Sequence, residues 1–410
     1  MTKPLKIKES LIEIENYISP LLQDFETFIK YVEEEKPTLS PRMGVLGKND
    51  SFKLNSELNY RKPVTAPNYL QDYYLIIDLM FSLAIESRLF LIINDEKGKA
   101  YLSVSTGTES FLKLNNFEKY VFLLETYWSK YNFDEKFNRW SGVFELYELL
   151  ELIANGKNDE RILKLVKTYT LFTGSASFSH HLHYFGLCKL ELIEGAKGKY
   201  EDSIKAVIPT DLGIIICKKL LNEAINFWNI QDSKILLEFS GIKVKKNNNQ
   251  DLFSIIAGIF PDNIVQQTII DEVEPEIDRC AVYTFKVSLS KNIWRKIRMS
   301  YKNTFEDLHL AIQEVFNFDN DHLYEFYIGG SRRTAKIIYT GNPYDGVEDD
   351  TYIGEAGIYT GQKIKYIFDF GDHWEFDIIV ISIDKDVPIP VKPEIIESKG
   401  ESPEQYPEWE

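Results

Sequence analysis

Two aspartates and two histidines in the last third of the chain have residue types suited to metal chemistry. Asp369 and Asp372 lie three residues apart, and His309 and His322 precede them in the sequence. Carboxylate oxygens and imidazole nitrogens are common ligands of divalent metals. If the fold brings these four side chains together, they would form a metal-dependent hydrolase or phosphoryl-transfer site. A divalent metal is expected as a cofactor under this hypothesis only, and otherwise no cofactor is predicted.

The tripeptide Asp369-Phe370-Gly371 also occurs in protein kinases, where its aspartate binds magnesium. A kinase additionally needs a glycine-rich loop, a strand lysine and a catalytic loop upstream, and these are not found in order. Gly371 suits a turn, and the carboxylate of Asp369 or Asp372 can accept backbone N–H bonds there. A turn between two strands is therefore the simpler interpretation.

Other clusters of polar residues are less specific. In "SHHLH", His180 and His183 lie one helical turn apart, but no HExxH or paired-cysteine motif completes a metal set, so an ordinary polar helix surface is predicted. Asp319 and Asp321 begin like a calcium loop, but Leu323 follows where an oxygen ligand belongs. That stretch is predicted to be a turn that ends a helix. The sequence has no P-loop, no GxSxG elbow and no dinucleotide fingerprint.

Charge and length limit the functions that fit this chain. With 410 residues, roughly two or three domains are expected. The formal net charge is −16; residues 276 to 410 hold 15 basic against 25 acidic residues, or −10, which leaves −6 for residues 1 to 275. Both parts therefore repel a phosphate backbone on average, and weak or no binding of duplex DNA is predicted. Protein partners are expected instead, and the sequence does not identify a small-molecule ligand.

The cysteines and the apolar segments indicate the compartment. Cys188, Cys217 and Cys280 are an odd number without CxxC spacing, which is more typical of a reducing compartment than of a disulfide framework. The first residues alternate charged and apolar side chains and do not resemble a signal peptide. No apolar stretch is long enough to cross a bilayer. A cytoplasmic protein without membrane association is predicted.

The chain changes character after residue 270, at the acidic stretch "DEVEPEIDR". Helical periodicity dominates before it and strand alternation after it, so an α+β protein is predicted. The expected domains are a helical module with a β-hairpin at 1–135, a helical and winged-helix-like module at 136–270, and an α+β domain at 276–410.

The first two modules resemble each other. Residues 67–128 and 159–228, about a hundred residues apart, both predict helices, a hairpin with a Lys-Gly-Lys turn at Gly98 or Gly198, and a final helix. Thr108 and Thr210 are expected to cap that final helix. Helices followed by a hairpin and a helix are the layout of a winged helix, in which Lys197 and Lys199 would lie near DNA phosphates at the wing tip.

The part after residue 276 predicts an antiparallel sheet with a helix on one face. Residues 281–301 alternate apolar and polar side chains as two strands joined near residues 290–292. In the following helix, Leu308, Ile312 and Phe316 share one face, and Thr304 with Asp307 forms a capping box. Further strands are predicted at 322–328, 335–340, 362–370 and 374–383.

This last third resembles the plasmid pRiA4b ORF-3-like family, also described as the passenger protein of an IS1096-type insertion element. The matching stretches are "YTFKVSLSKNIWRKI", "TFEDLHLAIQEVFNFDNDHLYEF", "YIFDFGDHWEF" and "SKGESPEQYP". The resemblance implies an α+β domain found near mobile elements, without an established activity. Members commonly have a histidine two residues after the tryptophan of the third stretch, where this chain has Phe376. The motif residues are Trp294, Arg295, His309, Gln313, His322, Tyr366, Asp369, Gly371, Asp372 and Trp374.

A non-catalytic cytoplasmic binding or adaptor protein is the leading functional hypothesis, because no complete catalytic set accompanies domain shapes that often serve recognition. Its association with plasmids or mobile elements follows from the resemblance alone. Two alternatives stay open: the metal-dependent enzyme that uses Asp369 and Asp372, and a winged-helix DNA-binding protein that uses Lys197 and Lys199.

Overall fold

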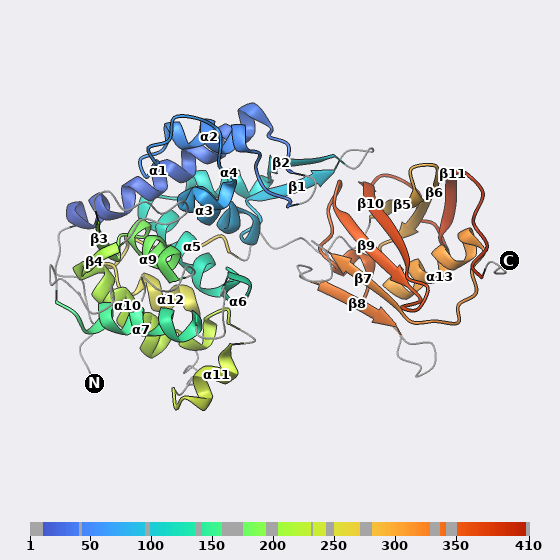
Figure 1. Cartoon of the computed structure of the whole chain (residues 1–410). Coiled ribbons are helices and arrows are strands. Elements are labelled where there is room, and N and C mark those ends of the chain that lie inside the picture. The colour runs from blue at the N-terminus through green and yellow to red at the C-terminus, as the bar shows by residue number, and fades with distance from the viewer. Residues whose placement is uncertain are drawn as a thin grey trace. The chain divides into compact units, whose positions relative to one another are not determined.

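The computed structural model divides into two compact units (Figure 1). One comprises Met1–Leu91 and Ser103–Val273, and the other Ile92–Leu102 and Glu274–Glu410. The α+β fold class is confirmed, with helices dominating the first unit and an antiparallel sheet the second. The boundaries near 135 and between 270 and 276 stay predictions. The structure describes residues 11–40, 43–94, 99–136, 142–157, 175–193, 204–230, 233–242, 250–270, 281–328, 337–341 and 351–406.

Residues 11–270 form helices and two separate β-hairpins, and Ile92–Leu102 of the first hairpin belongs to the second unit. None of the helices in the described ranges is long and apolar enough to cross a membrane. The hairpins are β1 (Phe90–Asn94) with β2 (Ala100–Val104), and β3 (Cys188–Leu192) with β4 (Ile204–Pro209). The helices are α1 (Leu11–Glu35), α2 (Lys48–Glu57), α3 (Leu75–Glu86), α4 (Thr106–Lys113), α5 (Asn116–Ser129), α6 (Phe133–Lys136), α7 (Gly142–Asn155), α9 (Ser175–Tyr184), α10 (Asp211–Glu223), α11 (Lys234–Phe239) and α12 (Leu252–Ala257).

Each hairpin is flanked by helices in the same way, in line with the predicted repeat. The residue that turns the chain from the first helix toward the strand has a positive φ in both modules, 57° at Arg88 and 71° at Gly186. One residue later, the carbonyl of Leu89 accepts a bond from the Ser105 backbone N–H, and that of Leu187 from the Thr210 N–H. The start of the strand thus anchors the start of the second helix in each module.

The caps of those second helices differ from the prediction in one case. Thr210 caps α10, since its hydroxyl accepts the Gly213 N–H at 2.9 Å. Thr108 is not a cap: Ser105 caps α4, and the Thr108 hydroxyl donates to the Leu89 carbonyl at 2.7 Å. The prediction failed because sequence does not show at which residue the hairpin ends.

The stretch 108–128, predicted as a single helix, forms the end of α4 and the whole of α5. A new helix begins because Asn115 and Glu118 form a reciprocal capping box. Whether these modules act as winged helices stays a prediction. The hairpin tips with Gly98, Lys197, Gly198 and Lys199 lie outside the described residues.

The histidines of α9 contradict the predicted polar helix surface. His180 and His181 are 4% and 3% exposed, and the neighbouring Phe178 is buried with them. The His181 ring packs edge-on against Tyr127 and Tyr131, and its Nδ1 lies 3.3 Å from the Tyr127 hydroxyl. His180 and His181 are therefore enclosed by protein, whereas His183 is half-buried.

The second unit is built on a seven-stranded sheet with α13 (Phe305–Phe316) on one face (Figure 1). The strand order is β11-β6-β5-β10-β9-β7-β8, and each registered pair is antiparallel. The strands are β5 (Val282–Ser290), β6 (Ile293–Ser300), β7 (Tyr324–Ile328), β8 (Ile337–Gly341), β9 (Lys363–Phe368), β10 (Trp374–Asp384) and β11 (Glu394–Lys399).

Alternation along the strands places one set of apolar residues against α13. Phe285 of β5 and Ile297 of β6 face the helix, where they meet its buried residues Leu308, Ile312 and Phe316. Thr304 and Asp307 form the expected capping box. The strand β11 was not predicted, because its residues "EIIESK" are all exposed and give no core pattern.

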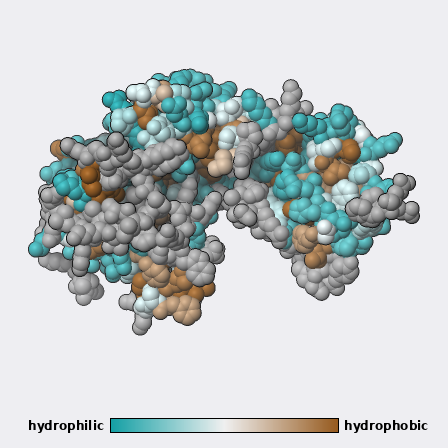
Figure 2. Space-filling view, viewed as in Figure 1, coloured by the Kyte–Doolittle hydropathy of each residue, from teal (hydrophilic) through white to brown (hydrophobic). Residues whose placement is uncertain are grey.

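An apolar surface lies outside these cores, on the short helix α11 of the first unit. Ile235 and Phe239 are 58% and 86% exposed there, and Figure 2 shows the corresponding brown area over α11. The chain on both sides of α11, at 231–232 and 243–249, lies outside the described residues.

Candidate functional site

The turn between β9 and β10 is organised by Asp369. Its Oδ1 accepts the backbone N–H of Gly371 at 2.8 Å and of Asp372 at 3.3 Å. Its own N–H donates to the Leu323 carbonyl at 3.0 Å, which ties the turn to the end of the α13–β7 loop. The left-handed positions are Asp369 and His373, not Gly371. Short polar side chains tolerate this conformation when they bond to the local backbone.

The second oxygen of Asp369 faces His322 from the α13–β7 loop. His322 Nε2 lies 3.4 Å from Asp369 Oδ2 and 3.8 Å from Asp321 Oδ2. The Asp369 side chain is 8% exposed, whereas that of His322 is 40% exposed. The Asp369 carboxylate therefore contacts the buried side of the His322 imidazole, and the rest of the ring is exposed to solvent.

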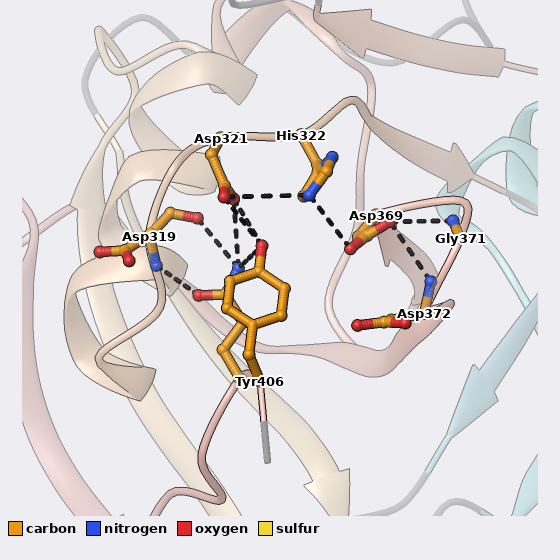
Figure 3. Close-up of polar contacts among 8 residues, drawn as sticks. Asp319, Asp321, His322, Asp369, Gly371, Asp372 and Tyr406 are labelled. Atoms are coloured by element: carbon orange, nitrogen blue, oxygen red, sulfur yellow. Dashed lines mark hydrogen bonds and ion pairs between the residues drawn. The ribbon is translucent and has the colours of Figure 1, made fainter. Parts of the chain in front are cut away.

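The end of the described chain closes the other side of this group (Figure 3). The Tyr406 hydroxyl donates to the Asp321 carboxylate, 2.9 Å from each oxygen. Partial burial and the neighbouring Asp321 raise the pKa of Tyr406, so the phenol stays a proton donor. The Gln405 amide pairs with the Asp319 backbone, accepting its N–H at 2.5 Å and donating to its carbonyl at 3.3 Å. We call Asp319, Asp321, His322, Asp369, Asp372, Gln405 and Tyr406 the carboxylate edge.

Arg295 holds the segment that carries Gln405 and Tyr406. Its guanidinium donates to the carbonyls of Val315 and Lys399 and to the Ser402 hydroxyl. Val315 lies in the last turn of α13, where the partial negative charge of the helix end favours a cation. Arg295 is 7% exposed, and its hydrogen bonds connect the end of α13 to β11 and to the segment after it.

His309 is buried in the core and is not part of the carboxylate edge. Its Nδ1 is 2.7 Å from the Tyr366 hydroxyl, and its Nε2 is 2.7 Å from Asn320 Oδ1. The Gln313 amide donates to the same Tyr366 hydroxyl at 2.8 Å. Burial lowers the pKa of His309 to about 4. A neutral ring that accepts from Tyr366 and donates to Asn320 satisfies all these contacts.

The four candidate metal ligands are therefore not gathered at one point. His322 and Asp369 meet, but both ring nitrogens of His309 are occupied by Tyr366 and Asn320. Asp372 is exposed on the turn, where its backbone N–H reaches Asp369. Within the described ranges, no group of three or more His, Cys, Asp or Glu side chains is placed to hold a metal ion.

The two tryptophans of the motifs occupy structural positions. Trp294 lies on the sheet face opposite α13, with the Lys286 ammonium 5.0 Å from its ring centroid. Trp374 packs edge-on against Phe318 at 4.8 Å. Each covers neighbouring side chains rather than the carboxylate edge.

Sequence reasoning missed Asp321, Gln405 and Tyr406 as members of the site. Asp321 was considered only as part of an incomplete calcium loop. Gln405 lies 86 residues after Asp319, and such a pairing depends on the path of β11 and the segment after it. The one signal was the final matching stretch, "SKGESPEQYP".

The fold and this edge define an α+β domain with a polar surface site and no recognisable catalytic set among its described residues. Residues 281–406 match the model of the family described as plasmid pRiA4b ORF-3-like protein. The C-terminal third of the chain therefore matches this family, as its motifs predicted.

A solved structure gives a further likeness. A crystal structure of a protein of unknown function from Methanosarcina mazei Go1 is 25% identical, with a TM-score of 0.25, and the match covers 30% of this chain and 71% of that chain. No curated protein matches this chain.

Proposed function

We propose that the C-terminal unit is a non-catalytic binding module, and that its carboxylate edge contacts a basic segment of a partner protein. The observation that carries this proposal is the group formed by Asp321, His322 and Asp369. Two carboxylates lie within 3.8 Å of one half-exposed imidazole.

The carboxylates of this edge are positioned by neutral donors. Backbone N–H groups hold Asp369, and the Tyr406 phenol holds Asp321. Hydrogen bonds from neutral groups fix a carboxylate without cancelling its charge. The exposed side chain of Asp372 and the backbone-paired Asp319 add two further negative charges nearby. A preorganised anionic surface favours a lysine or arginine of a partner.

The charge of the whole chain supports the same class of partner. A net charge of −16 attracts basic segments over a distance of about 8 Å at physiological salt. The same charge opposes duplex DNA. The association of this module with plasmids or mobile elements is part of the proposal, and the description of the matched family names a plasmid.

A fluorescein-labelled peptide of alternating arginine and serine is a suitable probe of this edge. Fluorescence anisotropy would measure its affinity for the full chain and for the double variant Asp321→Asn, Asp369→Asn. Asparagine keeps the size and the backbone acceptor of each side chain but removes its charge. We expect affinity to fall by about thirtyfold, since the two lost charges are worth about 1 kcal/mol each, or about 2 kcal/mol together.

Glu355→Gln is the matched control. Glu355 is an exposed carboxylate beside the opposite end of α13, where Ile353 N–H bonds to the Asn303 carbonyl. If the control loses half as much binding free energy as the double variant, in proportion to the one charge removed against two, only net charge matters and the proposed site is wrong. Turnover of phosphoesters that requires a divalent metal and disappears in a folded Asp369→Asn variant would instead support the enzyme alternative.

Duplex DNA tests the remaining alternative in the same assay. We expect at most weak binding at physiological salt, because both parts of the chain are acidic. Submicromolar affinity with a steep salt dependence, lost on Lys197→Glu with Lys199→Glu, would show that the first unit reads DNA.

A further inference from the structure

The strand β11 leaves one side of the sheet open. It pairs with β6 and has no second neighbour among the described strands. All six of its residues are exposed, including the aliphatic Ile395 at 54% and Ile396 at 42%. An open edge presents backbone N–H and C=O groups to any strand that can approach it.

A bulge determines which side chains of β11 share a face. Glu394 and Ile395 pair with β6 in register, the register shifts at Ile396, and pairing resumes at Glu397. Glu394, Glu397 and Lys399 lie opposite Arg298, Lys296 and Trp294, which all point away from α13. Because of the extra residue, Glu394 and Lys399 point to the same face although they are five positions apart.

We propose that β11 pairs with β11 of a second copy of this chain, antiparallel and about a twofold axis. The axis passes beside Glu397, so Glu394 lies opposite Lys399 of the second copy, and Lys399 opposite Glu394 of the second copy. Ile395 then lies opposite Ser398 of the second copy on the other face. The sheets of the two copies become continuous through two opposite-charge pairs.

Charge distinguishes this register from other pairings. A parallel arrangement would place Glu394, Glu397 and Lys399 each opposite the same residue of the second copy, and like charges that face each other are destabilising. An antiparallel register that places Glu394 opposite Glu397 has the same fault. In the proposed register the two Glu397 side chains meet at the axis, and the pairing of each with its own Lys296 at 3.0 Å reduces their repulsion without removing it.

The resulting dimer is expected to be weak and reversible. Bulges and charged residues are features that keep strand edges from pairing indiscriminately, and here they leave one favourable register. A single pair of short strands buries less than the roughly 1,200 Å² typical of stable interfaces. Association should therefore depend on protein concentration.

Sedimentation velocity on the full chain, over about a hundredfold range of concentration, tests the proposal. Glu394→Lys and Lys399→Glu should each weaken self-association by about tenfold, since each turns two attractive pairs into repulsive ones. An equimolar mixture of the two variants should form a heterodimer as strong as the original dimer. Glu397→Gln should strengthen the dimer, because it removes the repulsion at the axis.

Glu355→Lys is the control, as it changes charge equally on the same unit without touching β11, and it should leave association unchanged. The proposal is overturned if the unmodified chain stays monomeric throughout the range, or if the mixture associates no better than the separate variants. Weaker association of Glu397→Gln would also overturn it, since that result requires a different register. Because Glu397→Gln keeps the size of the side chain, it tests the register even if a charge reversal disturbs folding.

Discussion

The histidines of the two units differ in environment more than in sequence. The chain has six, three on α9 and three in the C-terminal unit. On α9, His180 and His181 are enclosed by aromatic rings, and burial lowers the pKa of His180 to about 3. In the C-terminal unit His309 is buried, whereas His322 and His373 lie on loops at the ends of interior strands. A loop at the end of a strand, rather than the residue type, makes an imidazole available to a partner.

The largest expected effect is a loss of stability when a charged side chain replaces a buried histidine of α9. We expect His180→Lys to lower the free energy of unfolding of the first unit by on the order of 5 kcal/mol, since a buried ammonium must lose its proton or its burial. Urea unfolding followed by far-UV circular dichroism would measure the loss.

His373→Lys is the control for that substitution. The His373 side chain is 55% exposed and lies 3.8 Å from Glu375. A lysine there places an exposed cation beside a carboxylate, so stability should change by less than about 0.5 kcal/mol. Similar losses at both positions would contradict the difference between the two environments.

The second prediction concerns pH and the buried His309. Its pKa is about 4 in the folded chain and near 6.5 in an unfolded one. Between these values only the unfolded chain binds the proton, so stability is complete above pH 6.5 and falls as the pH drops toward 4. The loss from this residue should reach about 2 kcal/mol at pH 5.

His309→Gln should flatten this dependence, because glutamine does not titrate. Urea unfolding at pH 7 and pH 5, followed by the NMR amide signals of β10, would compare the two proteins in the C-terminal unit. An equally steep dependence in the variant would assign the titration to other groups. His180 changes stability in the same direction, but in the first unit, so signals from α9 should keep their dependence in the His309 variant.

Local features of the C-terminal unit could be predicted from sequence. Alternation along β5 and the capping box of Thr304 and Asp307 depend on neighbouring residues, and both were correct. The burial of His180 could not be predicted, because it depends on helices and loops that pack around α9 from distant parts of the chain. The polar residue types around His180 led to the incorrect prediction of an exposed helix surface.

The candidate site shows the same limit. The turn at Asp369 was predicted from its own residues, and the side-chain bonds to Gly371 and Asp372 agree. Its approach to His322 depends on how β7 lies beside β9, where Tyr324 pairs with Phe368. The separation of His309 from this group follows from its position on the buried face of α13, and sequence alone left the two histidines equivalent.

The smallest expected effect is a change in the free energy of unfolding that distinguishes His322 from His309. His322→Gln removes the contact between the imidazole and Asp369, but the Asp369 carboxylate keeps its bonds to the Gly371 and Asp372 backbone. Pairs that solvent reaches contribute about 0.2–1 kcal/mol, so the free energy of unfolding should fall by less than about 1 kcal/mol. The amide signals of Gly371 and Asp372 should stay near their original positions, because the turn is held by bonds within it.

His309→Gln, in contrast, disturbs the buried bonds to Tyr366 and Asn320 and should lower the free energy of unfolding by more in the same urea titration. A loss above about 2 kcal/mol for His322→Gln would place that imidazole among the residues that hold the fold, and would remove the reason to regard it as available to a partner.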